Sequence, residues 1–81
     1  MKLRVKLFAV ARQRIGRDSV EVEIRHGTTV RHLRGALVEQ FPPLADVVAH
    51  ARLAVNSEYA ADATPVPADA DVAIIPPVSG G

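Results

Sequence analysis

The residues best suited to chemistry stand at the carboxyl end of the chain, which closes on Gly80 and Gly81. Because neither glycine has a side chain, a narrow channel in another protein can close around them and still admit the terminal carboxylate. That carboxylate has an ordinary pKa of about 3.3 to 3.7, so at neutral pH it is an anion and a poor electrophile. A nucleophile can replace its oxygen only after the carboxylate has been activated.

Two prolines join this end to the rest of the chain. Pro76 and Pro77 lack the backbone N–H that a sheet needs, so the preceding strand must end at Ile75. We expect a compact domain over residues 1–75 and an extended tail over residues 76–81, which reaches roughly 20 Å when fully extended. A bare terminal Gly-Gly is often only a frayed end. A stiff Pro-Pro base directly after a compact domain favours a functional tail.

Other candidate sites give weaker signals. The three histidines, His26, His32 and His50, are scattered over different predicted elements and lack metal-ligand spacing, so no metal site is predicted. Ser79 has no histidine or acid placed by the sequence to activate it as a nucleophile. No glycine-rich phosphate loop is present, and we expect the chain to bind no nucleotide by itself.

Composition limits the class of protein and its compartment. The 81 residues suffice for one small globular domain, with 48% hydrophobic and 23% charged residues. A formal net charge of +1 gives no reason to expect binding to nucleic acid or to a membrane. Because the chain has no cysteine and no apolar run long enough to cross a bilayer, we expect a cytoplasmic protein without disulfides.

Hydrophobic periodicity predicts the elements that position the tail. A helix capped by Thr28 or Thr29 is expected to lay one apolar stripe against a sheet. After this helix we expect the chain to return parallel to the first strand. This order predicts an α+β fold, a β-grasp or ubiquitin-like roll whose mixed sheet carries one main crossover helix and a projecting C-terminal tail. Strands are predicted over residues 2–8, 19–24, 52–56 and 71–75, with a short segment at 59–60.

The same alternation predicts an apolar spot beside the tail. In the first strand Leu7 points inward and Phe8 outward, and in the last strand Ile74 points inward and Ile75 outward. If these two strands are neighbours, Phe8 and Ile75 lie together at the root of the tail. We interpret this spot as a partner interface.

Three segments of the chain resemble a known family. The resemblance is to the small subunit of molybdopterin synthase, a sulfur carrier of the MoaD/ThiS family, and it runs through essentially the whole chain. Its most specific part is the ending Pro-Pro-Val-Ser-Gly-Gly, whereas Ala70 and Ile74-Ile75 depart from the family's usual glycine and aromatic residues. The three segments are Lys6-Leu7-Phe8-Ala9-Val10-Ala11-Arg12, Leu53-Ala54-Val55-Asn56 and Asp69 to Gly81.

The resemblance implies a mechanism for the tail. A partner enzyme of the E1-like, adenylating kind joins Gly81 to AMP with ATP and magnesium, and a persulfide-type donor then yields a thiocarboxylate. The tail next enters a pocket of the large subunit of molybdopterin synthase, where its sulfur passes to the pterin precursor of the molybdenum cofactor. The chain itself binds no cofactor and acts only within this sulfurtransferase complex. Docking is expected through Phe8 and Ile75, with the tail contacts made by Pro76, Pro77, Val78, Ser79 and Gly80.

Two alternatives stay open. A related carrier that serves thiamine or cysteine biosynthesis has the same fold and Gly-Gly tail, and differs in its partner. A ubiquitin-like binding module has the same fold and performs no covalent chemistry at its end.

Overall fold

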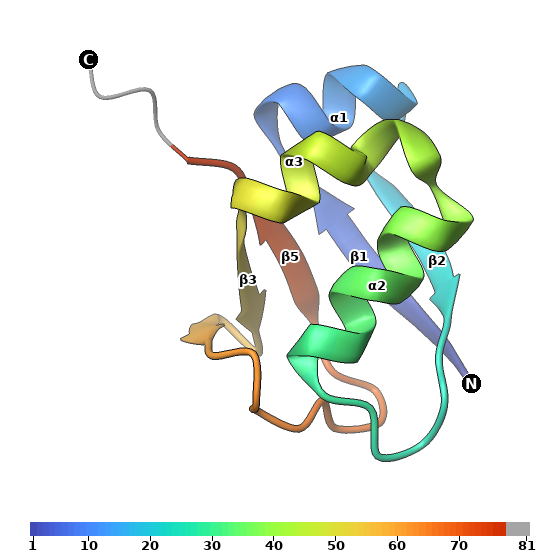
Figure 1. Ribbon diagram of the computed structural model, residues 1–81, viewed down its shortest axis with the longest axis vertical. Coiled ribbons are helices and arrows are strands. Elements are labelled where there is room, and N and C mark those ends of the chain that lie inside the picture. The colour runs from blue at the N-terminus through green and yellow to red at the C-terminus, as the bar shows by residue number, and fades with distance from the viewer. Residues whose placement is uncertain (78–81) are drawn as a thin grey trace.

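A five-stranded mixed sheet, with helices against one face, makes up the computed structural model, which describes residues 1–77 (Figure 1). The strand order is β2-β1-β5-β3-β4. The strands are β1 (Lys2–Leu7), β2 (Ser19–Glu23), β3 (Arg52–Val55), β4 (Glu58–Ala60) and β5 (Val72–Ile75). The helices are α1 (Ala9–Ile15), α2 (Val30–Gln40) and α3 (Ala45–His50), with a 3-10 turn, η1, at Pro42–Leu44. The predicted α+β fold, with a mixed sheet and one main crossover helix, is confirmed.

The direction of β3 corrects one expectation. β1 pairs antiparallel with β2 and parallel with β5, and β3 is antiparallel to both β5 and β4. The strand that follows the crossover helix therefore runs opposite to β1, so the prediction that the chain returns parallel to the first strand was wrong. The reason is geometric, because a helix that crosses the sheet once makes its two flanking strands parallel, and these are β2 and β3. The parallel neighbour of β1 is β5.

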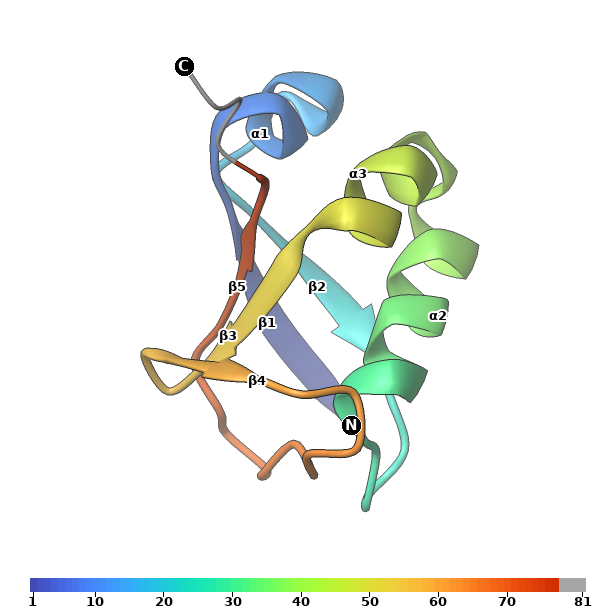
Figure 2. The same ribbon diagram turned by 60° about the vertical axis from the view of Figure 1, so that its left-hand side comes forward.

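The core lies between the inner face of the sheet and α2 (Figure 2). Inward and outward residues alternate along β1 and β2 as predicted, because successive side chains of a strand point to opposite faces. α2 contributes three completely buried residues, Val30, Leu33 and Leu37. Phe41 lies directly after the helix and is half-buried. The sheet contributes Leu3, Val5, Leu7, Val20, Val22, Leu53, Val72 and Ile74.

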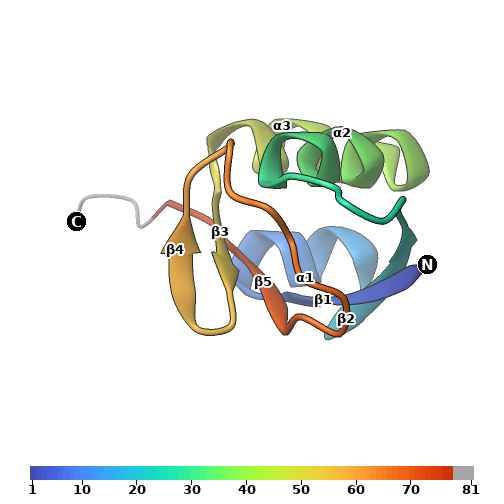
Figure 3. The ribbon, with the colours of Figure 1, turned by 90° about the horizontal axis from the view of Figure 1, so that it is seen from below.

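The start of α2 is held by a cap and by a distant loop. Thr29 is the cap, since its hydroxyl oxygen accepts from the backbone N–H of His32 at 3.4 Å. Thr28 instead donates its hydroxyl to the carbonyl of Arg25. The first N–H groups of the helix donate to carbonyls of residues 62 and 64, each at 2.9 Å. Figure 3 shows this segment between β4 and β5 beside the beginning of α2.

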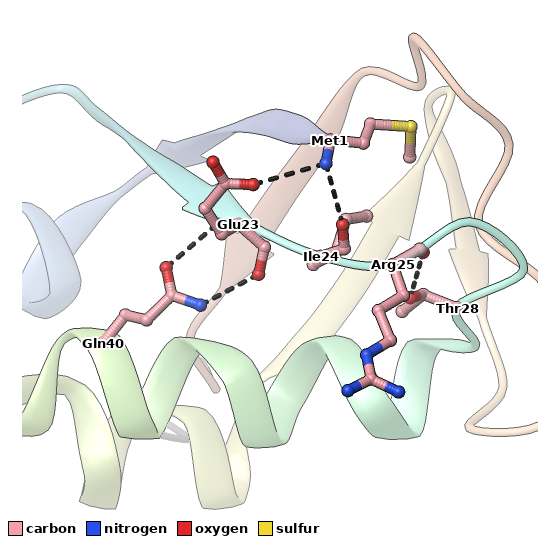
Figure 4. A network of polar contacts seen from close by, with 6 residues as sticks. All are labelled: Met1, Glu23, Ile24, Arg25, Thr28 and Gln40. Carbon is pink, nitrogen blue, oxygen red and sulfur yellow. Dashed lines mark hydrogen bonds and ion pairs between the residues drawn. The ribbon is translucent and has the colours of Figure 1, made fainter.

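The far end of α2 is tied to β2, one of the two edge strands of the sheet (Figure 4). The side-chain amide of Gln40 accepts from the N–H of Glu23 at 2.9 Å and donates to its carbonyl at 2.8 Å. The Met1 ammonium donates to the Glu23 carboxylate at 3.3 Å and to the Ile24 carbonyl at 3.1 Å. Backbone groups on the open side of an edge strand otherwise need solvent or another chain. Gln40 therefore takes the place of a neighbouring strand at this position.

Candidate functional site

The strand that carries the tail ends where the sequence predicts. β5 stops at Ile75, and Pro76 and Pro77 follow without strand structure, the first half-buried and the second exposed. The end of β5 lies on the same side of the molecule as α1 and the last residues of α3 (Figure 1). The predicted tail residues Val78, Ser79, Gly80 and Gly81 lie outside the described residues.

The structure brings Phe8 and Ile75 together at the root of the tail. Because Leu7 is the register partner of Ile74 in the parallel β1–β5 pair, the next residue of each strand, Phe8 and Ile75, lies at the same end of the sheet. Both line one open hollow of about 420 Å³ on the face opposite α2. Phe8 is 46% exposed and Ile75 is half-buried. Their role in contacting a partner stays a prediction.

A backbone turn fixes the position of Phe8. Phe8 itself is extended, with φ −129°, and the next residue, Ala9, has φ 50°. This left-handed conformation is uncommon for residues other than glycine. It lets the chain leave β1 and enter α1 within one residue, so Phe8 stays at the end of the sheet beside Ile75.

Tyr59 belongs to the same hollow and was given no role by sequence reasoning. It is 63% exposed, and the guanidinium of Arg52 lies over its ring at 4.9 Å from the ring centre. Tyr59 is the register partner of Ala54, which alternates with the buried Leu53 and Val55 and so faces outward. The sequence signal that could have found it is a two-residue turn directly after Val55, which pairs Tyr59 with the outward-facing Ala54.

The hairpin that carries Tyr59 is anchored to β5. Asn56 and Ser57 form its two-residue turn with φ 52° and 70°, as a turn that matches the twist of its strands requires. The Asn56 side-chain oxygen accepts from the N–H of Asp71 at 2.9 Å, and the Asn56 N–H donates to the Asp71 carbonyl at 2.7 Å. This exchange fixes β4, and with it Tyr59, relative to Ile75.

We call the outer surface around this hollow the docking face, and define it by Phe8, Tyr59 and Ile75. Its floor consists of Ala54 and Ala73, register partners in β3 and β5. These small side chains let a side chain from another protein approach the sheet closely. The polar side chains at its border are Lys6, Ser57 and Asp71, of which Lys6 and Asp71 are paired at 3.5 Å.

The described histidines do not gather at this face. His26 lies in the turn after β2, His32 in the first turn of α2, and His50 at the end of α3. Within residues 1–77, no three histidine, aspartate or glutamate side chains come close enough together to hold a metal ion. No helix in this part of the chain is long and apolar enough to cross a membrane.

The sheet order, the crossover helix and the docking face beside the end of β5 define a ubiquitin-like β-grasp protein. The model of the ThiS family matches residues 5–81, and the chain belongs to the ThiS family. It is 37% identical over 81 residues to the molybdopterin synthase sulfur carrier subunit of Arabidopsis thaliana. This match covers 100% of this chain and 84% of the plant protein.

Two solved structures support the same class. SAMP1 from Haloferax volcanii is 31% identical, with a TM-score of 0.85 and 100% of both chains covered. A putative molybdopterin converting factor, subunit 1, from Pyrococcus furiosus is 29% identical, with a TM-score of 0.80, covering 95% of this chain and 98% of that chain. The ubiquitin-like β-grasp fold expected from the sequence is thereby confirmed.

Proposed function

We propose that this chain is the sulfur carrier subunit of molybdopterin synthase and that Gly81 carries the sulfur as a thiocarboxylate. The observation that supports this most directly is the position of the docking face, whose residue Ile75 immediately precedes Pro76 at the root of the tail. The match to the ThiS family extends through residue 81, and the Arabidopsis relative is named as a sulfur carrier subunit.

The first chemical step of the proposal is activation of the terminal carboxylate. The carboxylate is a poor electrophile, so an adenylating, E1-like enzyme first converts it to an acyl-adenylate with ATP and magnesium. The outer sulfur of a persulfide-type donor then displaces AMP from the Gly81 carbonyl and forms an acyl disulfide. A second thiol, such as another thiol of the donor, cleaves the S–S bond, which leaves Gly81 as a thiocarboxylate and joins the two thiols in a disulfide. The two terminal glycines matter here because they allow the active site of the enzyme to close tightly around the chain.

The second step is delivery of the sulfur to another protein. The docking face binds the large synthase subunit, and the tail extends from the edge of this contact into a pocket where the pterin precursor is bound. Because Ile75 belongs to the docking face and Pro76 is the next residue, docking fixes the point from which the tail starts. Six residues reach roughly 20 Å, so the reacting atom can lie well inside the partner.

A second candidate function follows from one comparison. SAMP1 of Haloferax volcanii, the 31% identical structure, is a small archaeal modifier protein. If this chain is a modifier, its activated Gly81 is captured by an amine of another protein instead of by a sulfur donor. The two functions therefore share activation and differ in the nucleophile.

Mass spectrometry of the C-terminal peptide, on native protein isolated from its own cells, tests the proposal. We expect one oxygen of Gly81 to be replaced by sulfur, and the large synthase subunit to be isolated with the chain. Gly81 joined by an amide bond to a lysine of another protein favours the modifier. Isolation with an enzyme of thiamine synthesis favours the related carrier. An unmodified carboxylate in cells that are making the cofactor contradicts the proposal.

A further inference from the structure

Arg52 lies beside the docking face with its charge held in a fixed place. It begins β3 and is the register partner of Ile75, so the two residues are side by side at the root of the tail. Arg52 is exposed, and its guanidinium lies 4.9 Å from the centre of the Tyr59 ring. Arg52 takes part in none of the ion pairs found within residues 1–77.

The pairing of the strands explains how Tyr59 holds this guanidinium. Tyr59 is opposite Ala54, which follows Arg52 by two residues on the same face of β3, so Arg52 and Tyr59 are diagonal neighbours. Stacking on an aromatic ring uses the flat face of a guanidinium, and its N–H groups point outward in the plane. The arginine is therefore oriented before any partner binds, with donors available for a planar acceptor such as a carboxylate.

The charged side chains near Arg52 are paired with each other, so Arg52 is available to a carboxylate of another protein. Lys6 and Asp71, at the border of the hollow, are already paired with each other. A protein that covers the docking face removes water from Arg52 as well, and an unpaired guanidinium is costly to bury. A carboxylate on the partner removes this cost and forms two parallel hydrogen bonds with the guanidinium.

We propose that Arg52 is a specificity residue of the docking face, which pairs with a carboxylate on the large synthase subunit while Tyr59 holds its guanidinium in place. This inference rests on the proposed function, since it concerns the partner that receives the tail. Arg52 selects among partners by charge, because a partner with a basic or apolar residue opposite it leaves the guanidinium unpaired.

Calorimetric titration tests the inference with the large synthase subunit of the same organism as the probe. We expect Arg52→Gln to raise the Kd about tenfold, and the affinity of the wild-type chain to fall more steeply with salt than that of the variant. Arg25→Gln is the matched control, because Arg25 is an exposed arginine in the turn after β2, away from the docking face. It removes the same charge, and we expect a change in Kd of less than about twofold.

A double-mutant cycle tests the part played by Tyr59. Leucine keeps an apolar contact but offers no ring face, so Arg52→Gln should raise the Kd less in the Tyr59→Leu background than in the wild type. Equal effects of Arg52→Gln and Arg25→Gln overturn the inference, and additive effects in the cycle overturn the role of Tyr59. Thermal melting confirms that each variant is folded. A wild-type chain that does not bind the large subunit contradicts the proposed function itself, which distinguishes the two failures.

Discussion

Leu7 and Phe8 are neighbours in the sequence and have opposite environments. Leu7 is 2% exposed and lies in the core, whereas Phe8 is 46% exposed and lies on the docking face. The alternation of β1 places Leu7 inward, and the turn at Ala9 keeps Phe8 at the outer end of the sheet. Leu7 therefore serves stability, and under the proposed function Phe8 serves binding.

This division predicts different losses in two alanine variants. Leu7→Ala removes core atoms and leaves a cavity, so it should lower the free energy of unfolding by about 2 to 5 kcal/mol in a denaturant titration. Phe8→Ala should leave that free energy nearly unchanged and weaken binding to the large synthase subunit. Similar losses of stability in both variants would show that the assignment of faces is wrong.

A single residue added after Gly81 should separate chemistry from docking. The added residue moves the carboxylate away from the position in the activating enzyme where its oxygen attacks the α-phosphate of ATP, so ATP-dependent formation of the acyl-adenylate should be lost. The fold and the affinity for the large subunit should persist, because neither depends on the last carboxylate. Normal adenylation of the extended chain would contradict this prediction. Docking without adenylation of either the native or the extended chain would favour a passive binding module instead.

The contact between α1 and α3 should make stability depend on pH. Arg14 donates to both carboxylate oxygens of Asp46, at 2.5 and 2.9 Å, and to the Pro43 carbonyl at 3.1 Å. Chiefly through the hydrogen bond from Arg14, the pKa of the Asp46 carboxyl lies below its ordinary value, and the same bond raises the pKa of Arg14. A carboxyl whose pKa is lowered by folding stabilises the protein above its unfolded pKa, and that contribution is lost as the pH falls through the folded value.

Asp46→Asn should therefore cost most at neutral pH, and the gap to the wild type should close in acid. The effect is modest because both side chains are exposed. The free energies of unfolding of both proteins, measured from neutral pH down through the pKa of the Asp46 carboxyl in the folded protein, check the prediction. Glu39→Gln, which removes an exposed acid on α2, is the control. A gap that does not vary with pH would contradict it.

Arg34 should be the most important polar side chain for stability. It donates to the carbonyls of Val48 and Ala51, at 2.7 and 2.8 Å, and its Nε donates to the Asp62 carboxylate at 3.0 Å. It thus joins α2 to the end of α3 and to the segment before β5. Arg34→Met should lower the free energy of unfolding by about 1 to 3 kcal/mol, since those carbonyls lose their donor. Arg31→Met, on the exposed side of α2, should change it little.

Features with a local cause could be predicted from the sequence. The faces of β1 and β2 follow from strict alternation, a cap at Thr28 or Thr29 from their position before an apolar stripe, and the end of β5 from the two prolines that lack N–H groups. Phe8 and Ile75 could be placed together because each follows a buried residue in a strand, and only the adjacency of the strands had to be assumed.

Features with a long-range cause could not be predicted. The parallel neighbour of β1 is β5, the last strand of the chain, and the strand pattern alone does not state this pairing. The position of Tyr59, by contrast, has a local cause in the hairpin after Val55. That turn was missed because both of its residues have positive φ although neither is a glycine.

Transfer of labelled sulfur in a single turnover tests the central claim most directly. The chain, carrying labelled sulfur as a thiocarboxylate on Gly81, is mixed with the large synthase subunit and the pterin precursor. We predict that the label leaves the chain, appears in the dithiolene of the pterin product, and leaves Gly81 as a carboxylate. Label that stays on the chain while product forms would contradict the claim that this protein is the sulfur donor.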